Sequence, residues 1–200
     1  MIGNYFLDSC LNSTVINEPW DHQIINDTLP HKDFNTLRKE CERLSVPNDK
    51  LVTIYPKDFN DYNISFYDQI HDISKSILDN ARQLCDKYTN HRWFEDLAVN
   101  AHISVTPPLP YKFYIHQEGL EKIWSSVTYV TPENNVGTKM YTEQKEDTFV
   151  KEAEWKPNST FIFCGQQGKT WHSYESDQTK QRITLNLFLM KDNKRCFYRG

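Results

Sequence analysis

The spacing of apolar residues along the chain changes near residue 95. Before that point, apolar residues recur every three or four positions over residues 30–44 and again over residues 65–88. This spacing places the apolar side chains on one face of an α-helix, so we expect two helices that pack on a neighbouring layer. Ahead of the first helix, the sequence His22-Gln-Ile-Ile25 predicts a short strand.

After residue 95, the spacing is typical of β-structure. Runs rich in Val, Ile, Thr, Tyr and Phe alternate with turn-forming clusters of Pro, Asn and Gly. The predicted strands are Val99–Val105, Lys112–His116, Lys122–Thr131, Thr138–Tyr141, Thr148–Ala153, Thr160–Cys164, Thr170–Tyr174 and Arg182–Met190. About eight short strands at regular spacing favour a barrel or jelly roll. We therefore expect an α+β fold, in which N-terminal helices pack against a double-stranded β-helix (jelly roll).

No flexible Gly/Ser-rich linker separates the two regions. We expect one domain over residues 1–200, with a helical half at 1–95, a jelly-roll core at 96–190 and a C-terminal tail at 191–200. The five cysteines are widely spaced and include no CxxC pair, which favours reduced thiols. Because we also see neither a signal-peptide pattern nor a membrane-spanning segment, we expect a cytoplasmic protein.

The charge of the chain narrows the choice of partners. A formal net charge of −4 gives no bulk attraction to nucleic acid or to an anionic membrane surface. We therefore expect a small-molecule or peptidyl substrate and no membrane partner, and the charge mildly disfavours a nucleic-acid polymer. The sequence does not indicate an oligomeric state.

Three side chains in the β region have the residue types of a mononuclear iron site. His116 and Glu118 form a His-x-acid pair at a strand end, and His172 lies in a later strand. Two imidazoles and one carboxylate on one face of the ion leave the other face open for a cosubstrate and oxygen. About one His-x-acid pair is expected by chance, so the pair alone is not specific. A second pair, His31 and Asp33, lies at an expected helix start, where Asp33 is better explained as a first-turn charge.

Arg182 and Thr184 open the last predicted strand and share one face of it. A buried guanidinium is costly unless it meets an anion, and a dicarboxylate cosubstrate would provide one. The alternative is an arginine at a strand end that is solvated or paired with a surface acid.

The order of motifs between His22 and Met190 resembles the prolyl-hydroxylase-like branch of the Fe(II)/2-oxoglutarate oxygenases. In that branch, a His-x-acid pair is followed by a strand with Tyr, a Gly before a short strand, a Phe-rich strand, a His and an Arg-x-Ser/Thr motif. The matching segments are His116/Glu118, 125–132, 137–141, 155–163, His172 and Arg182-Ile-Thr184.

This resemblance implies a role for each candidate residue. His116, Glu118 and His172 would bind Fe(II) as the catalytic metal, and Arg182 and Thr184 would hold the distal carboxylate of 2-oxoglutarate. Tyr129 matches a family position that contacts the same carboxylate, with an ordinary core tyrosine as the alternative. The implied activity is hydroxylation of a C–H bond in a peptidyl, amino-acid or other small substrate, with release of succinate and CO₂.

The chain departs from the family pattern at two places. Glu118 stands where most members have Asp, and its side chain is longer by about 1.5 Å. Metal–ligand distances tolerate only about 0.2 Å, so the backbone or the rotamer must compensate. In place of the usual Tyr on the preceding strand, Asn100, His102 and Ser104 share one face. This face could line the pocket, but for His102 we favour a hydrogen-bonded core histidine.

Two other functions fit the same residues. A cupin-like metalloenzyme would keep the three metal ligands but would not need Arg182 or Tyr129. A non-catalytic binding or structural protein on this fold would bind no metal at all. We expect Trp124 and Trp171 to be packing residues, with a platform for the substrate as the alternative.

Overall fold

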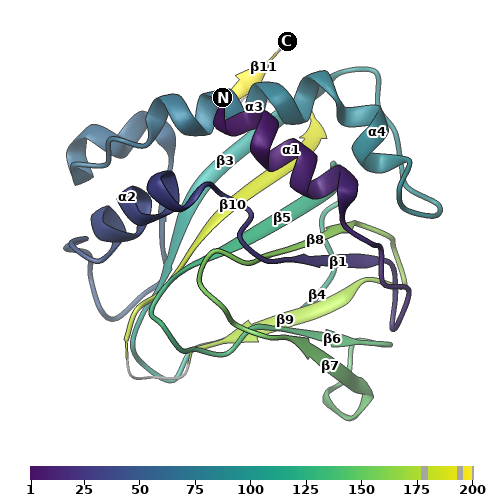
Figure 1. Cartoon of the computed structure of the whole chain (residues 1–200). Helices are drawn as coiled ribbons and strands as arrows, with labels where there is room; N and C mark the ends of the chain where they lie inside the picture. The colour runs from purple at the N-terminus through teal and green to yellow at the C-terminus, as the bar shows by residue number, and fades with distance from the viewer. Residues whose placement is uncertain (177–179, 193–195, 200) are drawn as a thin grey trace.

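Two antiparallel sheets and a layer of helices make up the protein, which is described here by a computed structural model (Figure 1). The structure describes residues 1–176, 180–192 and 196–199. The strands are β1 (His22–Ile25), β2 (Val52–Ile54), β3 (Leu97–Thr106), β4 (Lys112–His116), β5 (Lys122–Thr131), β6 (Thr138–Tyr141), β7 (Phe149–Ala153), β8 (Thr160–Cys164), β9 (Trp171–Glu175), β10 (Arg182–Lys191) and β11 (Tyr198–Arg199). The helices are α1 (Ile2–Asn12), α2 (His31–Cys41), α3 (Tyr67–Asp79) and α4 (Ala81–Cys85), with 3₁₀ turns at Pro56–Tyr62 and Glu146–Thr148.

The large sheet has the strand order β1-β8-β5-β10-β3-β11, with β2 also paired to β3, and the small sheet has the order β4-β9-β6-β7. Every predicted strand is present to within two residues at either end, so the expectation of a β region with helices against it is confirmed. The finer description as a double-stranded β-helix stays a prediction. Residues 193–195 and 200 of the expected C-terminal tail lie outside the described residues, whereas β11 pairs with β3.

The prediction of one helix over residues 65–88 was wrong, because the helix breaks at Asn80. This residue has φ −118° and ψ 20°, and its side-chain amide donates to the Ser76 carbonyl at 2.9 Å. Both features are typical of a helix end, where an Asn side chain can bond one of the last carbonyls of the helix. Helix α1 was not predicted, although Phe6 and Cys10 are fully buried one turn apart.

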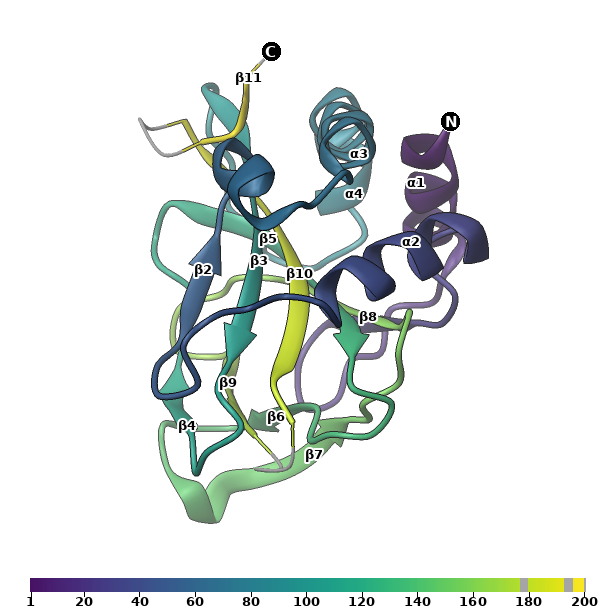
Figure 2. The same cartoon turned by 90° about the vertical axis from the view of Figure 1, so that its left-hand side faces the viewer.

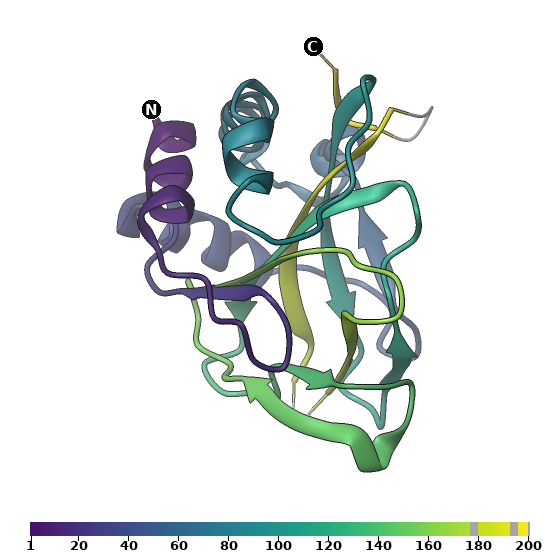
Figure 3. The same ribbon diagram turned by 90° about the vertical axis from the view of Figure 1, so that its right-hand side faces the viewer.

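Helices cover one face of the large sheet (Figures 2 and 3). Helix α3 contacts β3 and β10, and helix α2 contacts β5. The apolar core of this layer includes Leu37, Ile70, Ile77, Leu185 and Leu187, all fully buried. None of the described helices is long and apolar enough to cross a membrane.

Strand β10 connects this core to the site. Successive side chains of a strand point to opposite faces, so Leu185 and Leu187 point to the helices while Thr184 and Asn186 point to the other side. The central position of β10, paired with β3 on one edge and β5 on the other, holds these side chains in a fixed register. A second core, which includes Tyr129, Met140 and Phe161, joins the two sheets.

Candidate active site

A cavity of about 200 Å³ opens between the two sheets. Five of the six residues predicted from the sequence line it: His116, Glu118, His172, Arg182 and Thr184. They come from β4 and the loop after it, from β9 and from β10. Residues distant in sequence therefore meet at one place that a small ligand could enter.

The two histidines face each other across the pairing of β4 and β9. His116 lies opposite His172 in the register, and their ring centroids are 4.2 Å apart. A register shift between Phe113 and His116 inserts one extra residue into β4. Because such a bulge changes the direction of the side chains that follow it, both Phe113 and His116 line the cavity.

Each imidazole is held by a backbone carbonyl. The Nδ1 atom of His116 donates to the Tyr114 carbonyl, and that of His172 donates to the Thr170 carbonyl, both at 3.0 Å. This fixes the tautomer and leaves Nε2 of each ring as the nitrogen with a lone pair, the arrangement typical of metal-binding histidines. Burial lowers the pKa of His172 to about 4 and also lowers the pKa of His116, so both rings are neutral at pH 7.

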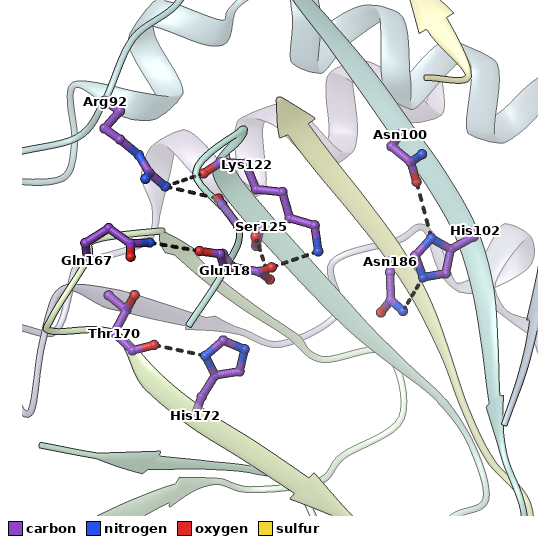
Figure 4. A network of polar contacts seen from close by, with 11 residues as sticks. Arg92, Asn100, His102, Glu118, Lys122, Ser125, Gln167, Thr170, His172 and Asn186 are labelled. Atoms are coloured by element: carbon purple, nitrogen blue, oxygen red, sulfur yellow. Dashed lines mark hydrogen bonds and ion pairs between the residues drawn. The ribbon is translucent and has the colours of Figure 1, made fainter. Parts of the chain in front are cut away.

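The Glu118 carboxylate is buried and bound by other side chains (Figure 4). Its Oε2 atom lies 2.7 Å from the ammonium of Lys122, and its Oε1 atom accepts from the Ser125 hydroxyl at 3.1 Å. Burial opposes ionisation, but neighbouring cationic groups, led by the Lys122 ammonium, hold the pKa of Glu118 below its usual value. The carboxylate is therefore ionised, as a metal ligand must be.

Arg182 is the buried cation of the cavity. It is 2% exposed, and its guanidinium lies 4.6 Å from the ring centroid of Tyr174 and 4.9 Å from that of Trp155. Its Nε atom donates to the Val136 carbonyl at 3.3 Å, whereas Nη2 is buried without a hydrogen-bond partner. Among the described residues, no carboxylate forms an ion pair with it. Burial without a paired carboxylate lowers the pKa of the guanidinium below its usual value.

Tyr129 lies behind the cavity wall. Its hydroxyl donates to Thr138 Oγ1 at 2.9 Å and accepts from the Thr138 backbone N–H at 3.0 Å. The ring stacks on Trp155 with a centroid distance of 4.6 Å. The structure thus places Tyr129 near Arg182 with its hydroxyl already bonded, and its contact with a cosubstrate stays a prediction.

Three further residues considered from the sequence lie in ordinary structural surroundings. Trp124 is fully buried in the core between helices and sheet. His31 is exposed, and Asp33 lies in the first turn of α2.

A polar wall opposite the histidines contains His102, which sequence reasoning left open, and Asn186, which it missed. His102 Nδ1 donates to Asn100 Oδ1 at 3.3 Å, and Nε2 accepts from Asn186 Nδ2 at 3.1 Å (Figure 4). The Asn186 Oδ1 atom is buried without a hydrogen-bond partner. Asn186 has the same two-residue spacing after Thr184 as Thr184 has after Arg182, and this periodicity could have identified it.

The buried His102 is expected to make folding stability depend on pH. Burial lowers its pKa to about 4, whereas the unfolded chain has a pKa of about 6.5. The unfolded state therefore gains a proton first, and stability falls as pH drops from 6.5 towards 4. We expect His102 alone to lower the free energy of unfolding by about 2 kcal/mol between pH 7 and pH 5.

Urea unfolding of the parent protein and of His102→Gln at these two pH values measures this effect. Gln keeps one donor and one acceptor but does not titrate, so its pH-dependent loss should be smaller by about 2 kcal/mol. An equal loss in both proteins would show that the histidine does not carry the effect.

The donor set fits a divalent iron, with one adjustment. Two neutral imidazoles with Nε2 available and an ionised carboxylate line the same cavity. In the described part of the chain, however, no three His, Cys, Asp or Glu side chains are close enough together to hold a metal ion. The Glu118 carboxylate is instead held by the Lys122 ammonium and the Ser125 hydroxyl.

Comparison with known proteins identifies the fold. No protein-family model matches the sequence, and no curated protein matches it. Among solved structures, a prolyl hydroxylase of Trichoplax adhaerens, in complex with a hypoxia inducible factor oxygen degradation domain peptide fragment, has a TM-score of 0.60 at 11% identity. That match covers 96% of this chain and 90% of the other.

A viral collagen prolyl hydroxylase from Paramecium Bursaria Chlorella virus-1 has a TM-score of 0.56 at 10% identity, over 89% of this chain and 93% of the other. A structure of the same enzyme described as a 2OG complex has a TM-score of 0.53 at 10% identity, over 89% of this chain and 99% of the other. At such low identity the likeness concerns the fold alone. We conclude that this chain shares the oxygenase-like fold of the prolyl hydroxylases.

Proposed function

We propose that this chain is an Fe(II)- and 2-oxoglutarate-dependent oxygenase that hydroxylates a C–H bond. The substrate would be a peptidyl side chain, an amino acid or another small molecule, and succinate and CO₂ would be released. One of the structural neighbours was solved with a peptide, which makes a peptidyl substrate the first class to test.

The buried guanidinium of Arg182 carries the proposal. It lines the same cavity as the two imidazoles, its Nη2 atom has no partner, and no described acidic residue neutralises it. A cupin-like metalloenzyme has no need for a buried cation beside its ligands. An acidic cosubstrate that reaches from the metal to the arginine accounts for both features together.

The chain's own residues would position the reactants. His116, His172 and Glu118 would hold the iron, and Arg182 with Thr184 would hold the distal carboxylate of 2-oxoglutarate. Bound iron would supply the oxygen chemistry that no side chain provides. The apolar rings of Phe161 and Phe163, which also line the cavity, would exclude water from it.

An anaerobic titration tests this proposal. Metal-free protein receives Fe(II) and then 2-oxoglutarate, and a visible metal-to-ligand charge-transfer band is expected. The band should be lost in His172→Ala, because one of the two imidazoles is gone. It should persist in His31→Ala, which removes an exposed histidine from the surface of α2.

The other outcomes identify the rival functions. Fe(II) binding without the band would favour a cupin-like metalloenzyme that does not use 2-oxoglutarate. Failure to bind any metal would favour a non-catalytic protein on the same fold.

A further inference from the structure

A lysine inside the cavity holds the carboxylate that the metal would need. Lys122 Nζ lies 2.7 Å from Glu118 Oε2, and Glu118 is 7% exposed. Ser125 donates to the other carboxylate oxygen at 3.1 Å, so both oxygens are engaged (Figure 4). In this arrangement the carboxylate forms no metal-binding group with His116 and His172.

Both the backbone and the ammonium of Lys122 have partners in addition to Glu118. Lys122 is the first residue of β5, and its backbone N–H closes a turn onto the Gly119 carbonyl at 3.0 Å. Its carbonyl accepts from Arg92 at 2.8 Å. The ammonium lies 3.8 Å from the ring centroid of Phe188, a cation–π contact that strengthens when water is excluded.

A divalent metal ion and this ammonium compete for the same carboxylate, because both bind its oxygen lone pairs and repel each other at short range. We propose that the Lys122 ammonium binds the Glu118 carboxylate in the metal-free protein and thereby limits the metal affinity of the site. This inference rests on the proposed function, since it concerns the same three ligands. Metal binding then requires the Lys122–Glu118 ion pair to separate.

The cavity also offers the displaced ammonium a new partner. Asn186 Oδ1 is a buried acceptor without a hydrogen-bond partner, and Asn186 lines the cavity together with Lys122 and Phe188. The ring centroid of the neighbouring His102 lies 5.5 Å from that of Phe188. His102 is also close enough to Lys122 for the lysine charge to act on the imidazole. We assign Asn186 Oδ1 as the acceptor of the ammonium once the metal has taken the carboxylate.

Measuring Mn(II) affinity by the electron paramagnetic resonance signal of the free ion tests the competition. Lys122→Met keeps the length of the side chain but removes the charge, and it should bind Mn(II) about tenfold more tightly than the parent protein. A variant whose site is distorted by the substitution would bind Mn(II) more weakly. Tighter Mn(II) binding is therefore expected only if the lysine competes with the metal. Lys139→Met, which removes an ion pair with Glu175 outside the cavity, is the matched control and should leave the affinity unchanged.

Asn186→Leu tests the second partner. It should weaken Mn(II) binding in the parent protein, because the displaced ammonium loses its acceptor, and it should have no effect in the Lys122→Met background. The same weakening in both backgrounds would overturn the role of Asn186.

The remaining outcomes separate this inference from the proposed function. Equal Mn(II) affinity in the parent and in Lys122→Met would overturn the competition while leaving the metal site intact. Weaker binding in Lys122→Met would show that the lysine supports the bound carboxylate, which also overturns it. Absence of binding in both proteins, with Fe(II) as well as Mn(II), would overturn the metal site itself.

Discussion

Replacing Arg182 by leucine is expected to weaken binding of 2-oxoglutarate more than 100-fold while leaving the ligand-free protein at least as stable as the parent. The arginine is 2% exposed and its Nη2 atom has no partner, so its charge is buried without full compensation. Removing one partner of a buried charged pair costs about 3–5 kcal/mol, which exceeds 100-fold in affinity. In the absence of the ligand, an apolar side chain of similar volume avoids the cost of desolvating the charge.

Calorimetric titration of the metal-loaded protein with 2-oxoglutarate, together with thermal unfolding of the ligand-free protein, measures both effects. Arg182→Lys keeps the charge but cannot form bidentate hydrogen bonds with a carboxylate, so an intermediate affinity for 2-oxoglutarate is expected. Thr184→Val, which removes only a hydroxyl beside the arginine, should cost about tenfold. Unchanged affinity in Arg182→Leu would exclude the arginine as the anchor. A large loss of stability would show that its contacts with Tyr174 and Trp155 serve the fold.

The side chains at alternate positions of β10 are a part of the site that could be predicted from the sequence. Alternation along a strand has a fixed period, so Arg182 and Thr184 were expected on one side, and both line the cavity. The strands that carry His116 and His172 were predicted from their β-branched and aromatic residues, and the histidines lie opposite each other in the sheet. Local patterns were sufficient here because backbone geometry decides where such side chains point.

Long-range packing decides the features that were not predicted. The identity of Glu118 indicates a possible ligand, but its rotamer depends on Lys122 and Ser125, which approach from β5. The family resemblance pointed to Tyr129, but the bond of its hydroxyl to Thr138 on the facing sheet depends on how the two sheets pack. Where helix α3 ends at Asn80, the side-chain amide donates to the Ser76 carbonyl, a contact that the spacing of apolar residues does not predict.

Gly137→Ala is expected to destabilise the fold by at least about 3 kcal/mol, because a Cβ atom at this position would lie 1.7 Å from the Ala153 carbonyl oxygen. The contact is with backbone, so no rotamer change relieves it. Gly137 also donates its N–H to Glu152 at 2.6 Å, immediately before β6 pairs with β7. A shift here would reach the site, since β6 pairs directly with β9 and places Met140 opposite His172.

The matched comparison is Gly168→Ala, at a glycine with φ +73° and no atom within 4 Å of the added Cβ. That substitution introduces only the strain of a left-handed backbone, about 1–2 kcal/mol. Urea unfolding of the two variants therefore separates a backbone collision from conformational strain. If Gly137→Ala costs no more than Gly168→Ala, then β6 and β7 tolerate a wider separation than the structure has. In that case the stability of the small sheet, which carries His172, would depend less on the close approach of its strands than on the side chains packed between the two sheets.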